Sequence, residues 1–120
     1  DVEPNISFMG NEADFKMIIM NLSQNAIKAM PDGGELRISA EKNNRHIIVN
    51  VKDTGTGIDE EKIKHIFEPF YSANTRVKSS GLGLAIVNSL MTKAHGSIVV
   101  KSKINKGTRF SLRFPQNKKI

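Results

Sequence analysis

The sequence predicts an α+β fold, a two-layer sandwich in which helices cover one face of a mixed β-sheet. Two stretches of helical periodicity, one early in the chain and one past its middle, predict the helical layer. Two pairs of alternating segments, each joined by a short polar turn, predict two hairpins. Elements in this order are typical of a sheet with its helices on one side. The 120 residues suit a single domain, residues 1–120.

The first part of the chain predicts a short strand and then the longest helix. Ile6 and Phe8 alternate with polar neighbours, and Asn11 is a residue type that commonly caps a helix. The turn sequence PDGG at residues 31–34 ends the helix. Apolar residues at helical spacing define its buried stripe over about residues 12–30; they are Phe15, Ile18, Ile19, Leu22, Ala26 and Ala29.

The remaining elements follow from alternation and from capping residues. Asp59 predicts the start of a short helix. Residues 71–80 are polar and aperiodic, which predicts a loop, and the helical pattern returns from Gly81 to about Ala94. Alternation around the turns KNNR and INKG predicts the hairpin strands, which lie at residues 36–40, 47–51, 97–103 and 107–114.

Composition limits the classes of function. The chain has a net charge of +6 and no cysteine, which excludes disulfides and thiolate metal sites. No apolar run reaches the roughly 18 residues of a membrane span. A basic balance favours an anionic partner such as nucleotide phosphates, acidic lipid or nucleic acid, and an ordinary solvated surface explains it equally well. One Tyr, no Trp and scattered basic residues argue against a surface that stacks nucleic-acid bases.

Two asparagines and a lysine stand out inside the predicted first helix. Asparagine is a poor helix former, because its amide competes for backbone hydrogen bonds. Asn21, Asn25 and Lys28 form one ridge beside the apolar stripe, at the edge of the buried face. An asparagine carbonyl oxygen suits Mg²⁺, and a lysine can meet a phosphate as a point charge. Ordinary surface polarity is the alternative that this segment alone leaves open.

Strand parity places two polar residues on the inward face of the sheet. Asp53 continues the inward alternation of residues 47–51, so its buried carboxylate needs a donor, for example the exocyclic amine of a purine. Gly55 and Gly57 let the backbone approach a flat ligand. Thr108 points inward at the start of the last strand, where it could help a bridging water hold a base. The alternatives are a turn-starting Asp and a Thr that favours β structure.

Two further motifs carry weaker signals. The sequence GLG at residues 81–83 lets backbone N–H groups at a helix N-terminus face an anion, although a lone GxG is weak evidence. The sequence FEPF at residues 67–70 places apolar anchors before the polar loop, where they either hinge the loop or join the core. The order of all the motifs along the chain is much more specific than any one of them.

Four motifs in this order resemble those of the sensor histidine kinases. NLSQNAIKA, DTGTGI, FEPF and GLGLAIV resemble the N box, first glycine box, F box and second glycine box, and HGSIVVKSKINKGTRFSLRFP resembles the closing hairpin of that family. The resemblance covers nearly the whole chain. It implies the Bergerat-type ATP-binding sandwich that the family shares with gyrase, mismatch-repair and heat-shock chaperone ATPases.

The resemblance implies ATP and Mg²⁺ as cofactors and gives roles by position. It implies that Asn25 is the magnesium ligand, that Asn21 and Lys28 act on the phosphates, and that these three are the catalytic residues. It also implies that Asp53 accepts from the adenine amine and that residues 71–80 are the mobile ATP lid. The other nucleotide-binding residues that it implies are Gly55, Gly57, Ile58, Phe70, Arg76, Lys78, Gly81, Leu82, Gly83, Leu84 and Thr108.

The implied activity is transfer of the γ-phosphate of ATP to a histidine in bacterial two-component signalling. Related ATPases and serine kinases usually carry a glutamate one turn before the magnesium asparagine, and here Asn21 takes that place and cannot accept a proton. An ATPase or protein-serine kinase of the same superfamily is one alternative. A non-catalytic nucleotide-binding signalling module is a second, and a nucleic-acid binder is a more distant third.

The implied partners are ATP, a dimerisation and phosphoacceptor domain, and a response regulator. His46, His65 and His95 lack the family's phosphoacceptor context, so we expect the acceptor domain upstream in the same protein. Position 1 is Asp rather than Met, which suggests an excised part of a longer chain. We expect a cytoplasmic domain with no nucleic acid and no direct membrane contact, in a parent protein that is either free or membrane-anchored.

Overall fold

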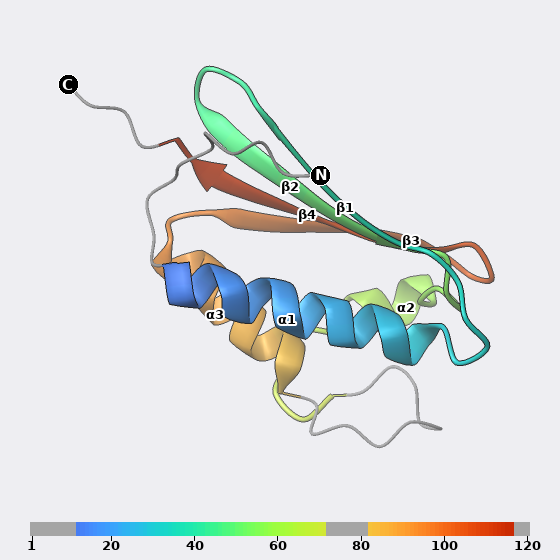
Figure 1. Ribbon diagram of the computed structural model, residues 1–120. Coiled ribbons are helices and arrows are strands. Elements are labelled where there is room, and N and C mark those ends of the chain that lie inside the picture. Colours follow the sequence, from blue (N-terminus) through green and yellow to red (C-terminus); the bar gives the residue numbers. More distant parts are fainter. Residues whose placement is uncertain (1–11, 72–81, 117–120) are drawn as a thin grey trace.

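The computed structural model describes residues 12–71 and 82–116, which form a sandwich of two layers. Figure 1 shows the helices together beneath one face of the sheet, while no described helix covers the other face. This is the α+β sandwich that the sequence predicts. The predicted strand at Ile6 and Phe8, the cap at Asn11 and the loop at residues 72–80 lie outside the described residues.

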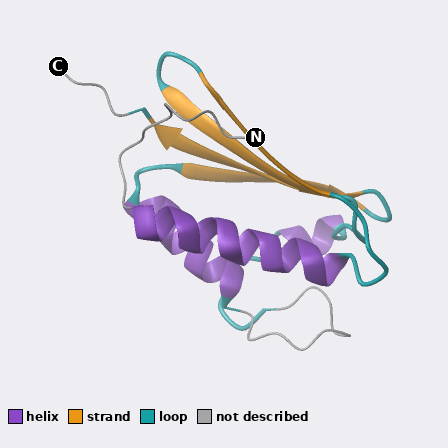
Figure 2. Ribbon diagram, in the orientation of Figure 1, coloured by secondary structure: helices purple, strands orange, loops and turns teal. Residues whose placement is uncertain are grey.

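Three described helices form one layer, and their bounds agree with the predicted segments (Figure 2). α1 (Glu12–Ala29) is the long amphipathic helix, and α3 (Gly83–Lys93) packs beside it. α2 (Glu60–Ile63) is a single turn. Asp59 caps α2 as predicted, since its side chain accepts a hydrogen bond from the N–H of Glu61 at 3.1 Å. None of the helices in the described ranges is both long enough and apolar enough to cross a membrane.

The described strands form the other layer, in the spatial order β1-β2-β4-β3. Both predicted hairpins are confirmed, β1 with β2 and β3 with β4, and they join where β2 pairs with β4. Each pairing is antiparallel, so the described part of the sheet is antiparallel and not mixed as the sequence predicts. The two hairpins have to be antiparallel, because a short turn can join only antiparallel strands. The strands are β1 (Leu36–Lys42), β2 (His46–Asp53), β3 (Ser97–Lys103) and β4 (Gly107–Pro115).

The core lies between the two layers. Side chains of the central strands β2 and β4 alternate between the core and the outer face, which makes one face of each strand apolar. The helices add their apolar stripes to the same cluster. The rings of Phe15 and Phe114 lie 5.9 Å apart across the layers. The largest fully buried side chains are Ile18, Leu22, Ile47, Val49, Val51, Val87, Met91, Phe110, Leu112 and Phe114.

We predict that Leu22→Ala lowers the free energy of unfolding by about 2–5 kcal/mol, because it leaves a cavity in the core. Leu22 is 0% exposed, whereas Ile27 on the same helix is 61% exposed. Ile27→Ala is therefore the matched control, with an expected change within about 0.5 kcal/mol. Urea unfolding followed by circular dichroism measures both variants. Equal losses would show that α1 does not bury the face described.

Candidate functional site

The candidate site is centred on Asp53, the last residue of β2. Asp53 is 3% exposed and lies on the inward face, as strand parity predicts. Its Oδ1 accepts two backbone hydrogen bonds, from the N–H of Gly55 at 2.8 Å and from the N–H of Thr108 at 3.2 Å. Both bonds reach the same oxygen, so Oδ2 is the carboxylate atom that remains to accept from a ligand.

Residues 53–58, which we call the glycine segment, begin at this aspartate and pack against the C-terminus of α1. The N–H of Thr56 donates to the carbonyl oxygen of Ala29 at 3.0 Å. A Cβ added to Gly55 would lie only 2.5 Å from the same carbonyl oxygen, so glycine is required for this close approach. The end of α1, and with it the end of the polar ridge, is therefore fixed beside the glycine segment.

The β3–β4 turn holds the other side of the glycine segment. The N–H of Asn105 in that turn donates to the carbonyl oxygen of Thr56 at 2.8 Å. Gly57 has a φ of +74°, and a Cβ there would lie 2.1 Å from the carbonyl oxygen of Lys103. Both the left-handed backbone and the contact require glycine. The segment therefore lies between two elements that are remote from each other in the chain.

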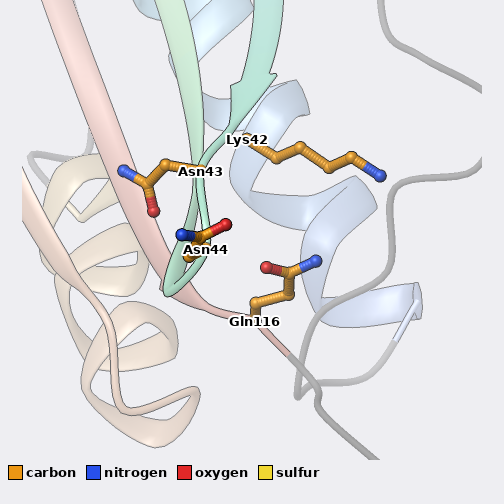
Figure 3. A pocket seen from close by; sticks show the side chains of 4 residues that line it. All are labelled: Lys42, Asn43, Asn44 and Gln116. Carbon is orange, nitrogen blue, oxygen red and sulfur yellow. The ribbon is translucent and has the colours of Figure 1, made fainter.

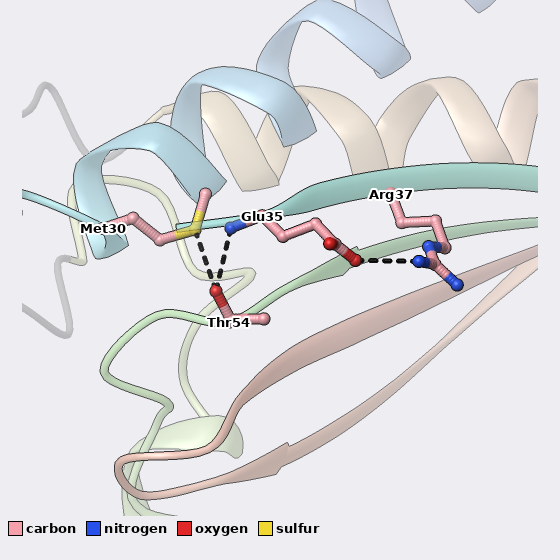
Figure 4. Close-up of polar contacts among 4 residues, drawn as sticks. All are labelled: Met30, Glu35, Arg37 and Thr54. Carbon is pink, nitrogen blue, oxygen red and sulfur yellow. Dashed lines mark hydrogen bonds and ion pairs between the residues drawn. The ribbon is translucent and has the colours of Figure 1, made fainter. Parts of the chain in front are cut away.

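A third connection runs through Thr54 to the start of β1. The hydroxyl of Thr54 accepts a hydrogen bond from the N–H of Glu35 at 2.9 Å and donates to Sδ of Met30 at 3.6 Å (Figure 4). Glu35 and Met30 flank the turn between α1 and β1. One side chain of the glycine segment thus fixes the path by which the chain leaves the helix layer and enters the sheet.

Ser102 on β3, which no motif in the sequence indicates, connects the glycine segment to β4. Its Oγ accepts from the N–H of Ile58 at 2.7 Å, donates to the carbonyl oxygen of Gly107 at 3.1 Å and lies 2.7 Å from Oγ1 of Thr108. Because Ser102 donates its single hydroxyl proton to the carbonyl oxygen of Gly107, Thr108 is the donor in the bond between the two hydroxyls. Thr108 then offers only acceptor lone pairs to a ligand. The inward position of Ser102 in the alternation of β3 is the signal in the sequence that could have indicated this residue.

The polar ridge of α1 faces the beginning of α3. Asn21 and Asn25 are half-buried, and Lys28 is exposed in the last turn. The Nδ2 of Asn21 donates to the carbonyl oxygen of Met17 at 2.9 Å. Its Oδ1 is turned toward α3, because a Cβ added to Gly83 would lie 3.1 Å from that oxygen. The structure thus brings Asn21 of the ridge close to Gly83 of the GLG motif.

Other residues of the predicted nucleotide site have different surroundings. Ile58 and Leu84 pack against the core, as does Phe67 of the FEPF motif. Phe70 of the same motif is 79% exposed, with a φ of 67° that is unusual for a bulky residue. Leu82 occupies the N-cap position of α3 and makes no side-chain capping hydrogen bond. The two rings of the FEPF motif therefore differ, since Phe67 packs against the core and Phe70 is exposed.

A surface hollow beside the β1–β2 turn lies at the opposite end of the sheet from Asp53 (Figure 3). The Oδ1 of Asn43 in that hollow accepts from the N–H groups of Arg45 and His46 at 2.9 and 2.8 Å, which shapes the turn. The length of β2 separates this hollow from the glycine segment, so it does not belong to the candidate site. Its lining residues are Lys42, Asn43, Asn44 and Gln116.

The comparison with known families decides the identity of this arrangement. A family model described as "Histidine kinase-, DNA gyrase B-, and HSP90-like ATPase" matches residues 10–118. The chain belongs to this ATPase family. Sporulation kinase C of Bacillus subtilis is 39% identical over 106 residues, which are 88% of this chain and 24% of that protein. Sensor histidine kinase YvrG of the same organism is 40% identical over 115 residues, which are 93% of this chain and 20% of that protein. The chain thus spans less than a quarter of these two relatives.

Solved structures of histidine kinases share the fold. The catalytic domain of histidine kinase ThkA is 30% identical with a TM-score of 0.78, covering 89% of this chain and 70% of that one. The mycobacterial sensor histidine kinase MprB is 25% identical with a TM-score of 0.83, and the match covers 93% of this chain and 78% of that one. Full-length ShkA in complex with AMPPNP is 27% identical with a TM-score of 0.81, and the match covers 98% of this chain and 25% of that one. These likenesses identify the catalytic ATP-binding domain of a sensor histidine kinase, as the four motifs predict.

Some of the predicted site residues of this histidine kinase domain come together in the structure, at two places. Asp53, the two glycines after it and Thr108 meet at one end of the sheet, while Asn21 meets Gly83 between α1 and α3. Within residues 12–71 and 82–116, no cluster of three or more His, Cys, Asp or Glu side chains could hold a metal ion. The predicted site residues Arg76, Lys78 and Gly81 lie outside the described residues.

We predict that Ser102→Ala destabilises the histidine kinase domain by about 1–3 kcal/mol, because the N–H of Ile58 loses its acceptor. Ser97→Ala, at an exposed position of the same strand, is the matched control and should change stability by less than about 0.5 kcal/mol. Denaturant unfolding measures the stability. Amide hydrogen exchange at Ile58 should accelerate in Ser102→Ala alone, and unchanged exchange there would contradict the assigned contact.

Proposed function

We propose that this domain binds Mg-ATP and transfers its γ-phosphate to a histidine on a separate dimerisation and phosphoacceptor domain. The observation that carries the proposal is the carboxylate of Asp53, buried at the end of the sheet with both protein hydrogen bonds on one oxygen. A buried carboxylate oxygen favours a ligand that can donate to it. In a domain of this ATPase family, we infer that the donor is the nucleotide base.

Adenine fits this acceptor better than guanine does. Adenine presents an exocyclic amine, which donates to a carboxylate, whereas guanine presents a carbonyl oxygen at the equivalent position. Thr108, held by Ser102 at 2.7 Å, adds a second acceptor for a bridging water. The full-length relative ShkA is described in complex with AMPPNP, an adenine nucleotide analogue, which supports the same class of ligand for this chain.

We assign the ridge of α1 to the phosphates. Asn25 would supply its carbonyl oxygen to Mg²⁺, while Asn21 and Lys28 would hold the phosphate groups. The closeness of the Asn21 side chain to Gly83 supports this assignment, because this part of the ridge lies beside the first turn of α3, whose N–H groups favour an anion. When bound, Mg²⁺ neutralises phosphate charge, and phosphoryl transfer depends mainly on positioning and neutralisation.

We assign the acceptor histidine to another domain. In the transfer, the bond between Pγ and the bridging oxygen of ATP breaks while Pγ bonds to an imidazole nitrogen, so the acceptor needs a free lone pair and no base at Asn21. The described histidines lie at other places in the fold: His46 opens β2, His65 Nδ1 lies 2.6 Å from Oε2 of Glu68, and His95 follows α3 with a φ of 59°. The much greater length of the relatives accommodates such a domain in the parent protein.

We also place the domain in bacterial two-component signalling, with a response regulator as the final phosphoryl acceptor. Relatives named Sensor histidine kinase YvrG and Heme sensor protein HssS support this setting. ATP as the substrate favours the cytoplasm, and the parent protein is either free there or anchored to a membrane.

We predict that the native domain prefers ATP to GTP and that Asp53→Asn weakens ATP binding at least tenfold. The asparagine oxygen can still accept from Gly55 and Thr108, but its amide replaces the acceptor Oδ2 with a donor. The lost charge-assisted bond corresponds to about 1.5–3 kcal/mol.

Asp32→Asn is the control for that variant, since Asp32 is exposed in the turn after α1. Titration calorimetry with ATP and GTP measures all three proteins. Equal affinities of the native domain for the two nucleotides would rule out Asp53 as the base-reading residue.

We predict very slow ATP hydrolysis by the domain alone and an acid-labile phosphohistidine when the acceptor domain is added. Asn25→Ala should abolish this transfer, whereas Gln24→Ala, at an exposed neighbouring position on α1, should leave it near the native rate. Radiolabelled ATP and acid treatment of the product measure the transfer. Fast multiple-turnover phosphate release by the isolated domain would favour the ATPase alternative instead.

A further inference from the structure

A row of four cations crosses the outer face of the sheet, the face that no described helix covers. The strand register pairs Arg37 with Lys52, Lys52 with Arg109, and Arg109 with Lys101. All four side chains are exposed, and none belongs to the apolar core. We name these four residues the cation row. It contains one residue from each described strand, at the same end of the sheet as Asp53.

Little in the described ranges, residues 12–71 and 82–116, balances this charge. Like charges directly opposite each other on neighbouring strands are destabilising, so the arrangement is unfavourable for the domain by itself. Among the described residues, the one ion pair to the row joins Arg37 to Glu35 at 3.0 Å (Figure 4). Lys103 lies two residues beyond Lys101 and adds a further cation on the same face.

We infer that the cation row is a docking surface for an acidic helix of a partner protein. Cross-strand neighbours lie about 4.5–5.5 Å apart between Cβ atoms. Acidic residues four apart on a helix lie about 5–6 Å apart. A helix laid across the strands, with carboxylates at i, i+4 and i+8, therefore matches successive cations of the row. The acidic helix would therefore match the cation row both in the spacing of its charges and in their opposite sign.

The neighbouring rows favour a protein over a polyanion such as nucleic acid. The adjacent row is neutral, from Ser39 through Asn50 and Ser111 to Val99, and Val99 is 52% exposed. An exposed aliphatic side chain can pack against a protein helix and gains nothing from a phosphate backbone. The outward positions of the four described strands carry no Phe, Tyr or Trp on which a base could stack.

This surface is separate from the proposed nucleotide site and does not depend on it. Lys52 precedes Asp53 in the chain, and Arg109 follows Thr108, so each pair points to opposite faces of the sheet. An acidic partner on the outer face and a nucleotide on the inner face can therefore bind at the same time.

The test uses two labelled helical peptides of identical composition on an alanine-rich scaffold. One carries glutamates at i, i+4 and i+8, and the other carries the same glutamates spread around the helix. Fluorescence anisotropy at low salt should show tighter binding of the aligned peptide, and added salt should weaken it. The double variant Lys52→Ser/Arg109→Ser should bind it about fivefold more weakly or worse.

The matched control is Lys16→Ser/Lys64→Ser, which removes the same net charge from exposed positions in and near the helix layer. It should bind the aligned peptide within about twofold of the native domain. Equal affinity for the two peptides, or equal losses in the two double variants, would overturn the proposal. A single-stranded oligonucleotide or an anionic phosphatidylserine vesicle that bound more tightly than the peptide, and only with the row intact, would overturn the choice of a protein partner.

Discussion

The hydrogen bonds of the buried Asp53 carboxylate are the constraint on which the rest of the structure depends. One oxygen bonds to the N–H of Gly55 and to the N–H of Thr108, so the end of β2 is tied both to the turn that follows it and to β4. An acceptor lost here would leave two buried amides unpaired, at a cost of about 1–3 kcal/mol each. The same two bonds orient the carboxylate. Stability of the sheet end and the proposed recognition of a base therefore depend on one side chain.

The glycine segment extends this constraint to the other elements. Ala29 holds it from α1, the β3–β4 turn holds it from the far side, and Ser102 bonds to its last residue, Ile58. Because α1 also carries Asn21 next to Gly83, the base side and the phosphate side of the proposed site are both positioned by α1. A displacement of α1 along its axis would change both sides at once, which makes the packing of Leu22 relevant to function as well as to stability.

Local patterns predicted much of this arrangement because they act over few residues. Parity placed Asp53 and Thr108 inward, and helical spacing placed Asn21 on the ridge. Ser102 has the same inward parity, but its role depends on the N–H of Ile58, 44 residues away, and no local pattern reports such a contact. The cation row was hidden for a similar reason. Turn chemistry predicts each hairpin, whereas the pairing of β2 with β4 that aligns Lys52 with Arg109 arises only when the two hairpins assemble.

The proposed recognition of the base by Asp53 can be tested with a nucleotide that differs from ATP by one group. Purine riboside triphosphate lacks only the exocyclic amine of adenine and keeps the ring, ribose and phosphates. Calorimetric titration of the unaltered domain, with Mg²⁺ present, should give an affinity for it at least tenfold below that for ATP, since a hydrogen bond to a charged acceptor is worth about 1.5–3 kcal/mol. Equal affinities for the two nucleotides would show that the carboxylate at the end of β2 does not read the base.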